Sequence, residues 1–158
     1  MRPMSSTTKA YLAGFLDGDG SIYVRLKPNP TYRYGFQVAP YVVFFQSSKS
    51  KKLFEKLCQL VGSGYVRERS DGIIEYIIGK EATIREFLEA VQPYVLLKQK
   101  QVILMLEILA YRKMVTNEKE FAKLMKLIER FGELNYSKRR LNRGIVPVET
   151  KRRTPIKG

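Results

Sequence analysis

Hydrophobic positions along the chain follow two spacings, one typical of helices and one typical of strands. Apolar residues recur at helical spacing in five segments, which predict helices near residues 6–16, 50–60, 81–91, 98–113 and 118–134. Apolar and polar residues alternate in four other segments, which predict strands near residues 21–27, 34–46, 64–69 and 73–78. The resulting order is αββαββα followed by C-terminal helices. It predicts an α+β fold in which four antiparallel strands form one sheet, with helices on its apolar face and a basic, open second face.

Two local features bear on the pairing of these strands. Asp71 and Gly72 lie between the third and fourth strands and indicate a tight hairpin turn. Pro40 falls inside the second strand and cannot donate a ladder hydrogen bond. We therefore expect a bulge or a sheet edge at Pro40.

The apolar periodicity stops near residue 135. We therefore expect one folded domain over residues 1–135, since 158 residues suffice for a single domain with its own core. Residues 136–158 contain eight Lys or Arg and one acid, Glu149, so they hold half of the net charge. This composition predicts a flexible basic tail. The tail is either an arm that binds nucleic-acid phosphates or a solvated terminus.

The charge of the chain points to a polyanionic partner. The formal net charge is +14, and the isoelectric point is near 9.9, a balance typical of nucleic-acid-binding proteins. Histidine is absent, which excludes histidine general bases and zinc fingers that contain histidine. Any hydrolysis by this chain must therefore use carboxylates, lysines and metal ions.

The sequence also bears on the cellular compartment. It has no run of 18 apolar residues, so we expect no spanning helix and no membrane partner. The polar N-terminal residues 1–9 do not resemble a signal peptide. The lone cysteine, Cys58, cannot form an intramolecular disulfide. We expect an intracellular, reducing compartment, either the cytoplasm of a prokaryote or an organelle.

The stretch LAGFLDGDG at residues 12–20 combines two unusual features. Small residues lie close together on the predicted helix, which allows another helix to approach closely. Two carboxylates follow at its C-terminal end, where the helix dipole disfavours negative charge. Such a placement indicates that a cation is bound there. The small residues are Ala10, Ala13, Gly14 and Gly18, and the carboxylates are Asp17 and Asp19.

This stretch resembles the LAGLIDADG motif of homing endonucleases. Residues 62–69 and 92–101 resemble further segments of the single-motif, homodimeric branch, and the resemblance covers residues 8–112. A calcium-binding loop at residues 17–28 is excluded, because Ile22 and Pro28 stand where that loop needs glycine and glutamate. The resemblance implies a four-stranded DNA-binding saddle. It also implies a metal-dependent double-strand break in a long, near-palindromic DNA target, made by a homodimer.

The resemblance assigns roles to individual residues. Asp19 corresponds to the metal ligand, with the backbone carbonyl of Gly18 beside it, Gln46 to a residue that orients water, and Lys98 to a lysine at the edge of the active site. Ser50 stands where close relatives have a basic residue, and the alignment leaves open whether Lys49 or Lys51 replaces it. The implied cofactor is Mg²⁺, with Mn²⁺ as a substitute and Ca²⁺ binding without cleavage.

Two further sets of residues complete these expectations. Asp17 is expected to be structural, capping or bound at the dimer interface. The interface is expected to contain Ala10, Ala13, Gly14, Asp17 and Gly18. Residues on the open sheet face and nearby lysines are expected to contact DNA bases and phosphates. They are Tyr23, Arg25, Lys27, Asn29, Gln37, Lys49, Lys51, Arg67, Arg69, Glu75 and Lys100.

Two other functions fit the same fold. The chain could be an RNA maturase that helps its intron RNA to splice, or a DNA-binding regulator without catalytic activity. Asp19, Gln46 and Lys98 favour an active enzyme, because binding alone does not need them.

Overall fold

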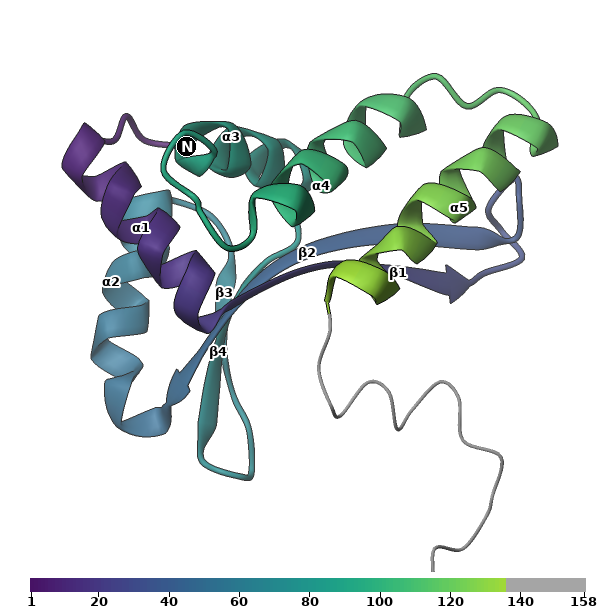
Figure 1. Cartoon of the computed structure of the whole chain (residues 1–158). Coiled ribbons are helices and arrows are strands. Elements are labelled where there is room, and N and C mark those ends of the chain that lie inside the picture. Colours follow the sequence, from purple (N-terminus) through teal and green to yellow (C-terminus); the bar gives the residue numbers. More distant parts are fainter. Residues whose placement is uncertain (136–158) are drawn as a thin grey trace, which may run out of the picture.

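A four-stranded antiparallel sheet in the order β1-β2-β4-β3 forms the centre of the fold (Figure 1). The computed structural model describes residues 1–135, so the expected basic tail over 136–158 lies outside the described residues. The strands are β1 (Gly20–Pro28), β2 (Phe36–Ser47), β3 (Tyr65–Glu68) and β4 (Ile73–Ile78). The helices are α1 (Ser6–Asp19), α2 (Lys51–Val61), α3 (Glu81–Val91), α4 (Gln99–Arg112), α5 (Glu118–Leu134) and the short 3-10 helix η1 (Ser48–Ser50). The predicted α+β order αββαββα with C-terminal helices is confirmed.

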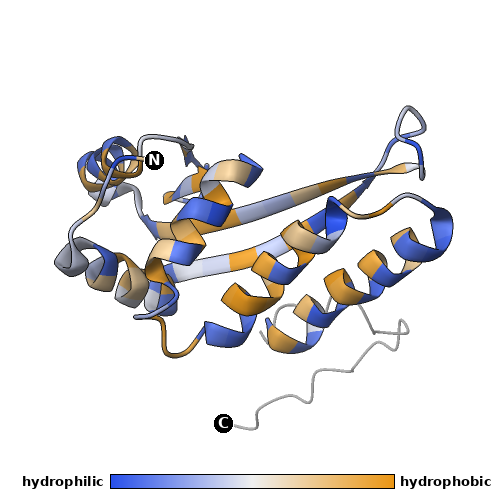
Figure 2. Ribbon diagram, turned by 90° about the horizontal axis from the view of Figure 1, so that it is seen from above, coloured by the Kyte–Doolittle hydropathy of each residue, from blue (hydrophilic) through white to orange (hydrophobic). Residues whose placement is uncertain are grey.

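Helices cover one face of this sheet and leave the other face open (Figure 1). In Figure 2, hydrophobic and hydrophilic positions alternate along α4 and α5, as expected for helices with one buried side. An aromatic column joins the layers: the ring of Phe44 on β2 lies 5.2 Å from that of Phe15 on α1, and 5.9 Å from those of Tyr76 and Phe87. Within residues 1–135 no helix is both long and apolar enough to cross a membrane.

Pro40 produces no bulge, so that part of the expectation is wrong. Strand β1 pairs with β2 one residue to one from Gly20 opposite Phe44 to Pro28 opposite Phe36, and Pro40 lies opposite Val24. Strand β4 pairs with β2 only from Val42 to Ser47. Pro40 therefore lies where β1 is the only neighbour of β2, and the missing N–H disturbs no ladder on the β4 side.

Helix α1 is longer than its sequence predicts. It continues to Asp19 instead of ending near Leu16, and β1 begins at the next residue, Gly20. A Cβ atom on Gly20 would lie 2.6 Å from Leu16 Cδ1 and 2.7 Å from the Leu16 carbonyl oxygen. Glycine is thus required at this direct helix-to-strand junction. The junction brings the end of α1 to the edge of the sheet.

Candidate active site and nucleic-acid interface

Asp19 and Gln46 meet where α1 passes into β1. Gln46 lies on the helix-covered side of β2, and its Nε2 donates to Asp19 Oδ2 at 3.3 Å. The Gln46 Oε1 accepts from the Ser47 N–H at 3.1 Å, which fixes the amide with its nitrogen toward Asp19. Asp19 is exposed, and within residues 1–135 only its Oδ2 accepts a hydrogen bond. The two predicted residues are therefore brought together.

Asp17 and Lys98 connect the same end of α1 to the start of α4. The two carboxylate oxygens of Asp17 accept from the backbone N–H groups of Leu96 at 2.8 Å and Lys98 at 2.9 Å. In return, Lys98 Nζ donates to the Asp17 carbonyl oxygen at 2.6 Å. Burial alone would raise the pKa of Asp17, but these hydrogen bonds and the Lys98 charge outweigh burial and lower it. Of the three expected roles, these contacts match the structural one, because the Asp17 carboxylate ties the end of α1 to the loop before α4 and caps neither helix.

The end of α1 offers only a few oxygen ligands for a divalent cation. Among residues 1–135, no group of three or more His, Cys, Asp or Glu side chains could hold a metal ion. Asp19 offers one exposed carboxylate, and the neighbouring Gly18 offers a backbone carbonyl. Magnesium keeps several waters and takes one or two carboxylates together with substrate phosphates, so this sparse set suits it.

The outer side of α1 carries a stripe of small residues. Ala10, Gly14 and Gly18 are exposed and four residues apart. A Cβ atom added to Gly14 or Gly18 would meet nothing within 4 Å. Ala13 does not belong to this stripe, contrary to expectation, because it is fully buried in the core of its own chain. Successive helical residues differ by about 100°, which turns Ala13 away from its neighbour Gly14.

Two leucines beside this stripe were not predicted. Leu96 and Leu97, in the loop that Asp17 holds, are 83% and 78% exposed. Both apolar side chains are therefore largely open to solvent in this loop. The sequence signal was available, since both follow Pro93 outside any amphipathic helix pattern.

The open face of β1 and β2 carries a cluster of cationic and aromatic side chains. Tyr23 lies opposite Tyr41, and Lys27 lies opposite Gln37, as the alternation of the two strands predicts. The Tyr23 and Tyr41 rings are 5.4 Å apart, and Arg25 Cζ lies within 6 Å of both ring centres. Tyr41 is absent from the predicted DNA-binding residues, although it shares the parity of Gln37. Sequence alternation was sufficient to include it.

Glu75 lies on the same open face as Arg67, as the alternation predicts, but its side chain is covered there. It lies opposite Arg67 on the neighbouring strand, and only 7% of its side chain is exposed. Arg67 Nε donates to Glu75 Oε2 at 2.6 Å, and Arg69 Nη1 lies 3.6 Å from Oε1. The hydrogen bond to Glu75 raises the pKa of Arg67. The carboxylate therefore holds the two exposed arginines in place and is itself covered by them.

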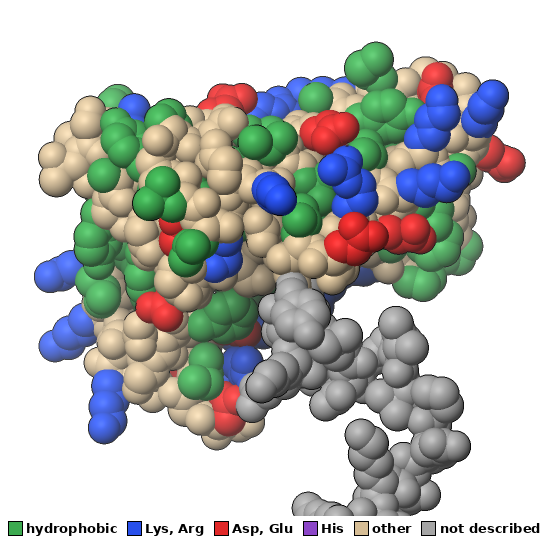
Figure 3. Space-filling view, viewed as in Figure 1, with side chains coloured by type: hydrophobic (Ala, Val, Ile, Leu, Met, Phe, Trp, Pro, Cys, Tyr) green, Lys and Arg blue, Asp and Glu red, His purple; other side chains and the backbone are tan. Residues whose placement is uncertain are grey.

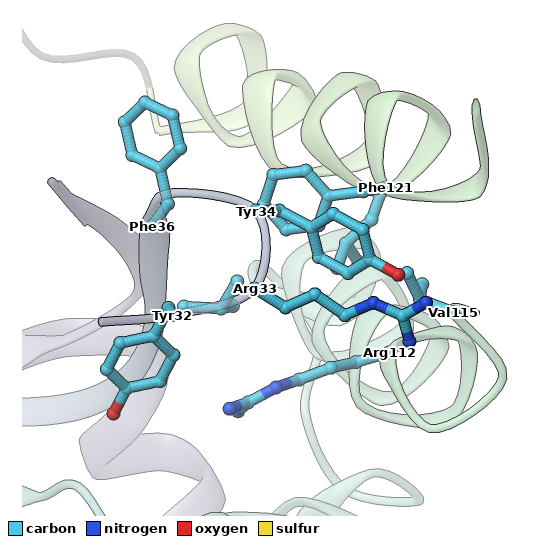
Figure 4. Close-up of a pocket in the computed structure, with 9 residues that line it drawn as sticks. Tyr32, Arg33, Tyr34, Phe36, Arg112, Val115 and Phe121 are labelled. Carbon is cyan, nitrogen blue, oxygen red and sulfur yellow. The ribbon is translucent and has the colours of Figure 1, made fainter. Parts of the chain in front are cut away.

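The loop between β1 and β2 is fastened to α5. Tyr34 stacks on Phe121 with ring centres 4.8 Å apart, beside a cavity of about 200 Å³ (Figure 4). Arg33 lies over the Tyr34 ring, with its Cζ 5.4 Å from the ring centre. Asn29, a predicted DNA contact, uses its side-chain oxygen to accept from Thr31 N at 3.0 Å. That oxygen shapes the turn.

Of the lysines predicted to contact phosphates, Lys49, Lys51 and Lys100 are exposed. Lys51 forms a half-exposed pair with Glu68 at 3.4 Å, whereas within residues 1–135 Lys49 Nζ makes no ion pair. Lys100 lies in the first turn of α4, close in sequence to Lys98. In Figure 3, Lys and Arg side chains project along the edge over α2, while both charge signs mix over α4 and α5.

This fold, with a carboxylate at the end of a small-residue helix beside an open basic sheet, is that of a LAGLIDADG endonuclease. A family profile described as LAGLIDADG endonuclease matches residues 12–111, and the chain belongs to this family.

Two curated relatives lie in the same family. The chain is 34% identical over 131 residues to DNA endonuclease I-CreI of Chlamydomonas reinhardtii, covering 82% of this chain and 80% of the relative. It is 32% identical over 134 residues to DNA endonuclease I-CvuI of Chlorella vulgaris, covering 83% and 81%.

Solved structures give the same result. The homing endonuclease I-CvuI, in complex with the I-CreI target in the presence of magnesium, has a TM-score of 0.78 at 28% identity and 84% coverage of both chains. The archaeal intron-encoded homing endonuclease I-Vdi141I complexed with DNA matches at a TM-score of 0.73, over 84% of this chain and 86% of that chain. At 19% identity this second likeness supports the fold alone.

Proposed function

We propose that this chain is a homing endonuclease that makes a magnesium-dependent double-strand break in a long, near-palindromic DNA site as a homodimer. Its relatives are DNA endonucleases, and one forms a complex with a DNA target in the presence of magnesium in which the DNA is not cleaved. The observation that carries the proposal is the meeting of Asp19, Gln46 and Lys98 at one end of α1. That end lies at the edge of an open, cationic sheet face, where a DNA backbone would pass.

Asp19 and the Gly18 carbonyl would hold the cation, and Mn²⁺ would substitute for Mg²⁺ while Ca²⁺ would support binding alone. When bound, the divalent ion would supply an activated water and neutralise charge at the scissile phosphate. The chain has no histidine to supply a general base by other means.

Other residues of the chain would orient the Asp19 carboxylate and add positive charge beside it. Gln46 fixes one Asp19 oxygen through its Nε2 and leaves the other free. Lys98 adds a positive charge beside the last turn of α1, anchored through the Asp17 carbonyl. Lys49 is the better candidate for the basic group that Ser50 lacks, because Lys51 is already paired with Glu68. Asp17 positions the loop that carries Lys98.

One chain offers one such carboxylate, whereas a double-strand break needs an active site for each strand. A two-fold dimer through the stripe of Ala10, Gly14 and Gly18 would bring two Asp19 side chains together. Leu96 and Leu97 flank this stripe and would be buried with it. Two copies of the sheet would then read two half-sites about one helical turn apart, ~10 bp.

Asp19→Asn tests the proposal on plasmid DNA that carries a target selected from a randomised library. We expect nicking and cutting with magnesium to disappear while binding with calcium persists, because the amide keeps the shape and removes the charge. Glu107→Gln is the matched control, since it removes an exposed carboxylate on α4, away from this site. It should cut like the unmodified protein.

The outcomes separate the candidate functions. Cutting by Asp19→Asn above a trace would contradict the site assignment. Specific binding without cutting by the unmodified protein would identify a DNA-binding regulator instead. Binding of structured RNA without specific DNA binding would identify a maturase.

A further inference from the structure

Four side chains on the open face of β1 and β2 contact one another. Tyr23 and Tyr41 form a tilted ring pair across the two strands. Arg25 Cζ lies 5.5 Å from the Tyr23 ring centre and 5.9 Å from that of Tyr41. Lys27 Nζ lies 5.4 Å from the Tyr41 ring centre and donates to the Tyr41 hydroxyl at 2.9 Å.

The contact between Lys27 and Tyr41 requires the lysine to lie along the sheet. The residue opposite Lys27 is Gln37, which is four positions, or roughly 13 Å, from Tyr41 along β2. Between them stands Ala39, which lies on the open face and yet is only 6% exposed. A small residue at this position leaves room for the side chains of Arg25 and Lys27 to fold over it.

These contacts restrict the Lys27 and Arg25 side chains, which otherwise have many rotamers. A lysine or arginine that is free before binding loses this freedom when it contacts a base. The aromatic faces attract both cations, and the Tyr41 hydroxyl gives the Lys27 ammonium a fixed direction. An ammonium has three donors, so two remain for a ligand after the bond to Tyr41.

We propose that Tyr41 is a positioning residue for sequence readout, which holds Lys27 and Arg25 as one preassembled unit that reads two guanines in each half-site. The inference rests on the proposed function. Arginine and lysine donate to guanine O6 and N7 in the major groove, and no other base offers two acceptors there. Tyr41 itself acts through the two cations.

The test compares discrimination at each base pair. A palindromic duplex selected by the unmodified protein is replaced one base pair at a time in both half-sites, and competition binding with calcium and cleavage with magnesium are measured. Tyr41→Phe keeps the ring and removes only the hydroxyl. Lys27→Met and Arg25→Met remove one cation each, and identify the base pair that each reads.

We expect Tyr41→Phe to lower discrimination at the base pair identified by Lys27→Met by about tenfold, with other positions changed less than about twofold. In the Lys27→Met background, Tyr41→Phe should add nothing at that pair. Tyr41→Leu removes the ring as well and should also weaken discrimination at the Arg25 pair. Tyr65→Phe, the same deletion on β3 of the open face, should leave the Lys27 and Arg25 pairs unchanged.

The results separate this inference from the proposed function. If the unmodified protein selects no DNA sequence, both fall. If it selects and cuts a target but Tyr41→Phe keeps the full profile, only the inference is refuted. An equal weakening at every base pair would also refute it, because that pattern is expected of a general structural defect. Two identified pairs without guanine would contradict the assigned chemistry.

Discussion

The carboxylate of Asp17 joins the end of α1 to a loop about eighty residues further along the chain. Its two oxygens accept from two backbone N–H groups, at 2.8 Å from Leu96 and 2.9 Å from Lys98. A hydrogen bond to a charged group contributes about 1.5–3 kcal/mol to the free energy of unfolding. Because Asp17 is partly exposed, water would hydrogen-bond to the two N–H groups when the carboxylate is removed and so recover part of this free energy. We expect Asp17→Ala to lower the free energy of unfolding by about 3 kcal/mol.

The pH dependence of this loss follows from the pKa of Asp17, which lies below its ordinary value. Burial acts to raise this pKa, but the backbone hydrogen bonds and Lys98 lower it by more. A carboxyl with a lowered pKa in the folded state stabilises that state fully above its unfolded pKa, about 3.9. The contribution disappears as the pH falls through the lower, folded pKa. The difference between the two proteins should therefore be full at pH 7 and shrink below about pH 4.

Urea unfolding of both proteins from pH 7 to pH 3, followed by circular dichroism, measures this difference. Asp17→Asn is the matched control, since it keeps one acceptor oxygen without the charge and should show a smaller loss. A difference that stays constant over this range would refute the electrostatic argument. No destabilisation at pH 7 would refute the anchoring role itself. Asp17→Ala keeps the backbone carbonyl that accepts from Lys98 Nζ, but it frees the loop that carries Lys98 from the carboxylate. We therefore also expect slower cleavage by Asp17→Ala at equal folded fraction.

Two further predictions concern assembly and DNA binding. Gly14→Leu should abolish the dimer in sedimentation and also cleavage, without unfolding the chain, since a side chain there meets open space within one protomer; a dimeric, active variant would contradict the α1 interface. Log affinity for the target should fall with log salt more steeply than about −3, at about −0.9 per neutralised phosphate. Deleting residues 136–158 should make this slope shallower, and an unchanged slope would exclude the tail from the footprint.

Sequence periodicity predicted nearly every element because the core depends on it. The strands follow the two-residue alternation, and the amphipathic helices bury one stripe each. The end of α1 was missed for a physical reason: Asp17 looks unfavourable at a helix C-terminus until its partners at Leu96 and Lys98 are known. Those partners are set by the tertiary fold, and nothing within a helical turn of Asp17 indicates them.

The candidate site, like the fold, was predicted from the sequence only in part. The family resemblance named Asp19, Gln46 and Lys98, and folding brings them to one end of α1. The face of Glu75 was predicted from the alternation, but the covering of its carboxylate was not, because that depends on the arginines of the neighbouring strand. Tyr41 was missed, although the alternation of β2 places it on the same face as Gln37. Its contact with Tyr23 depends on the pairing of β1 with β2, which the sequence does not give.

Most positions in the last two turns of α1 have a separate structural requirement. Leu16 is fully buried, Asp17 is bound to the loop before α4, and Asp19 contacts β2 through Gln46. Gly18 faces open space, whereas Gly20 touches Leu16 so closely that no side chain fits. The two glycines therefore differ: Gly20 is needed to fold one chain, whereas glycine at position 18 is needed only in the proposed dimer. Gly20→Ala should lower the stability of the monomer, while Gly18→Ala should leave it unchanged and weaken only the dimer.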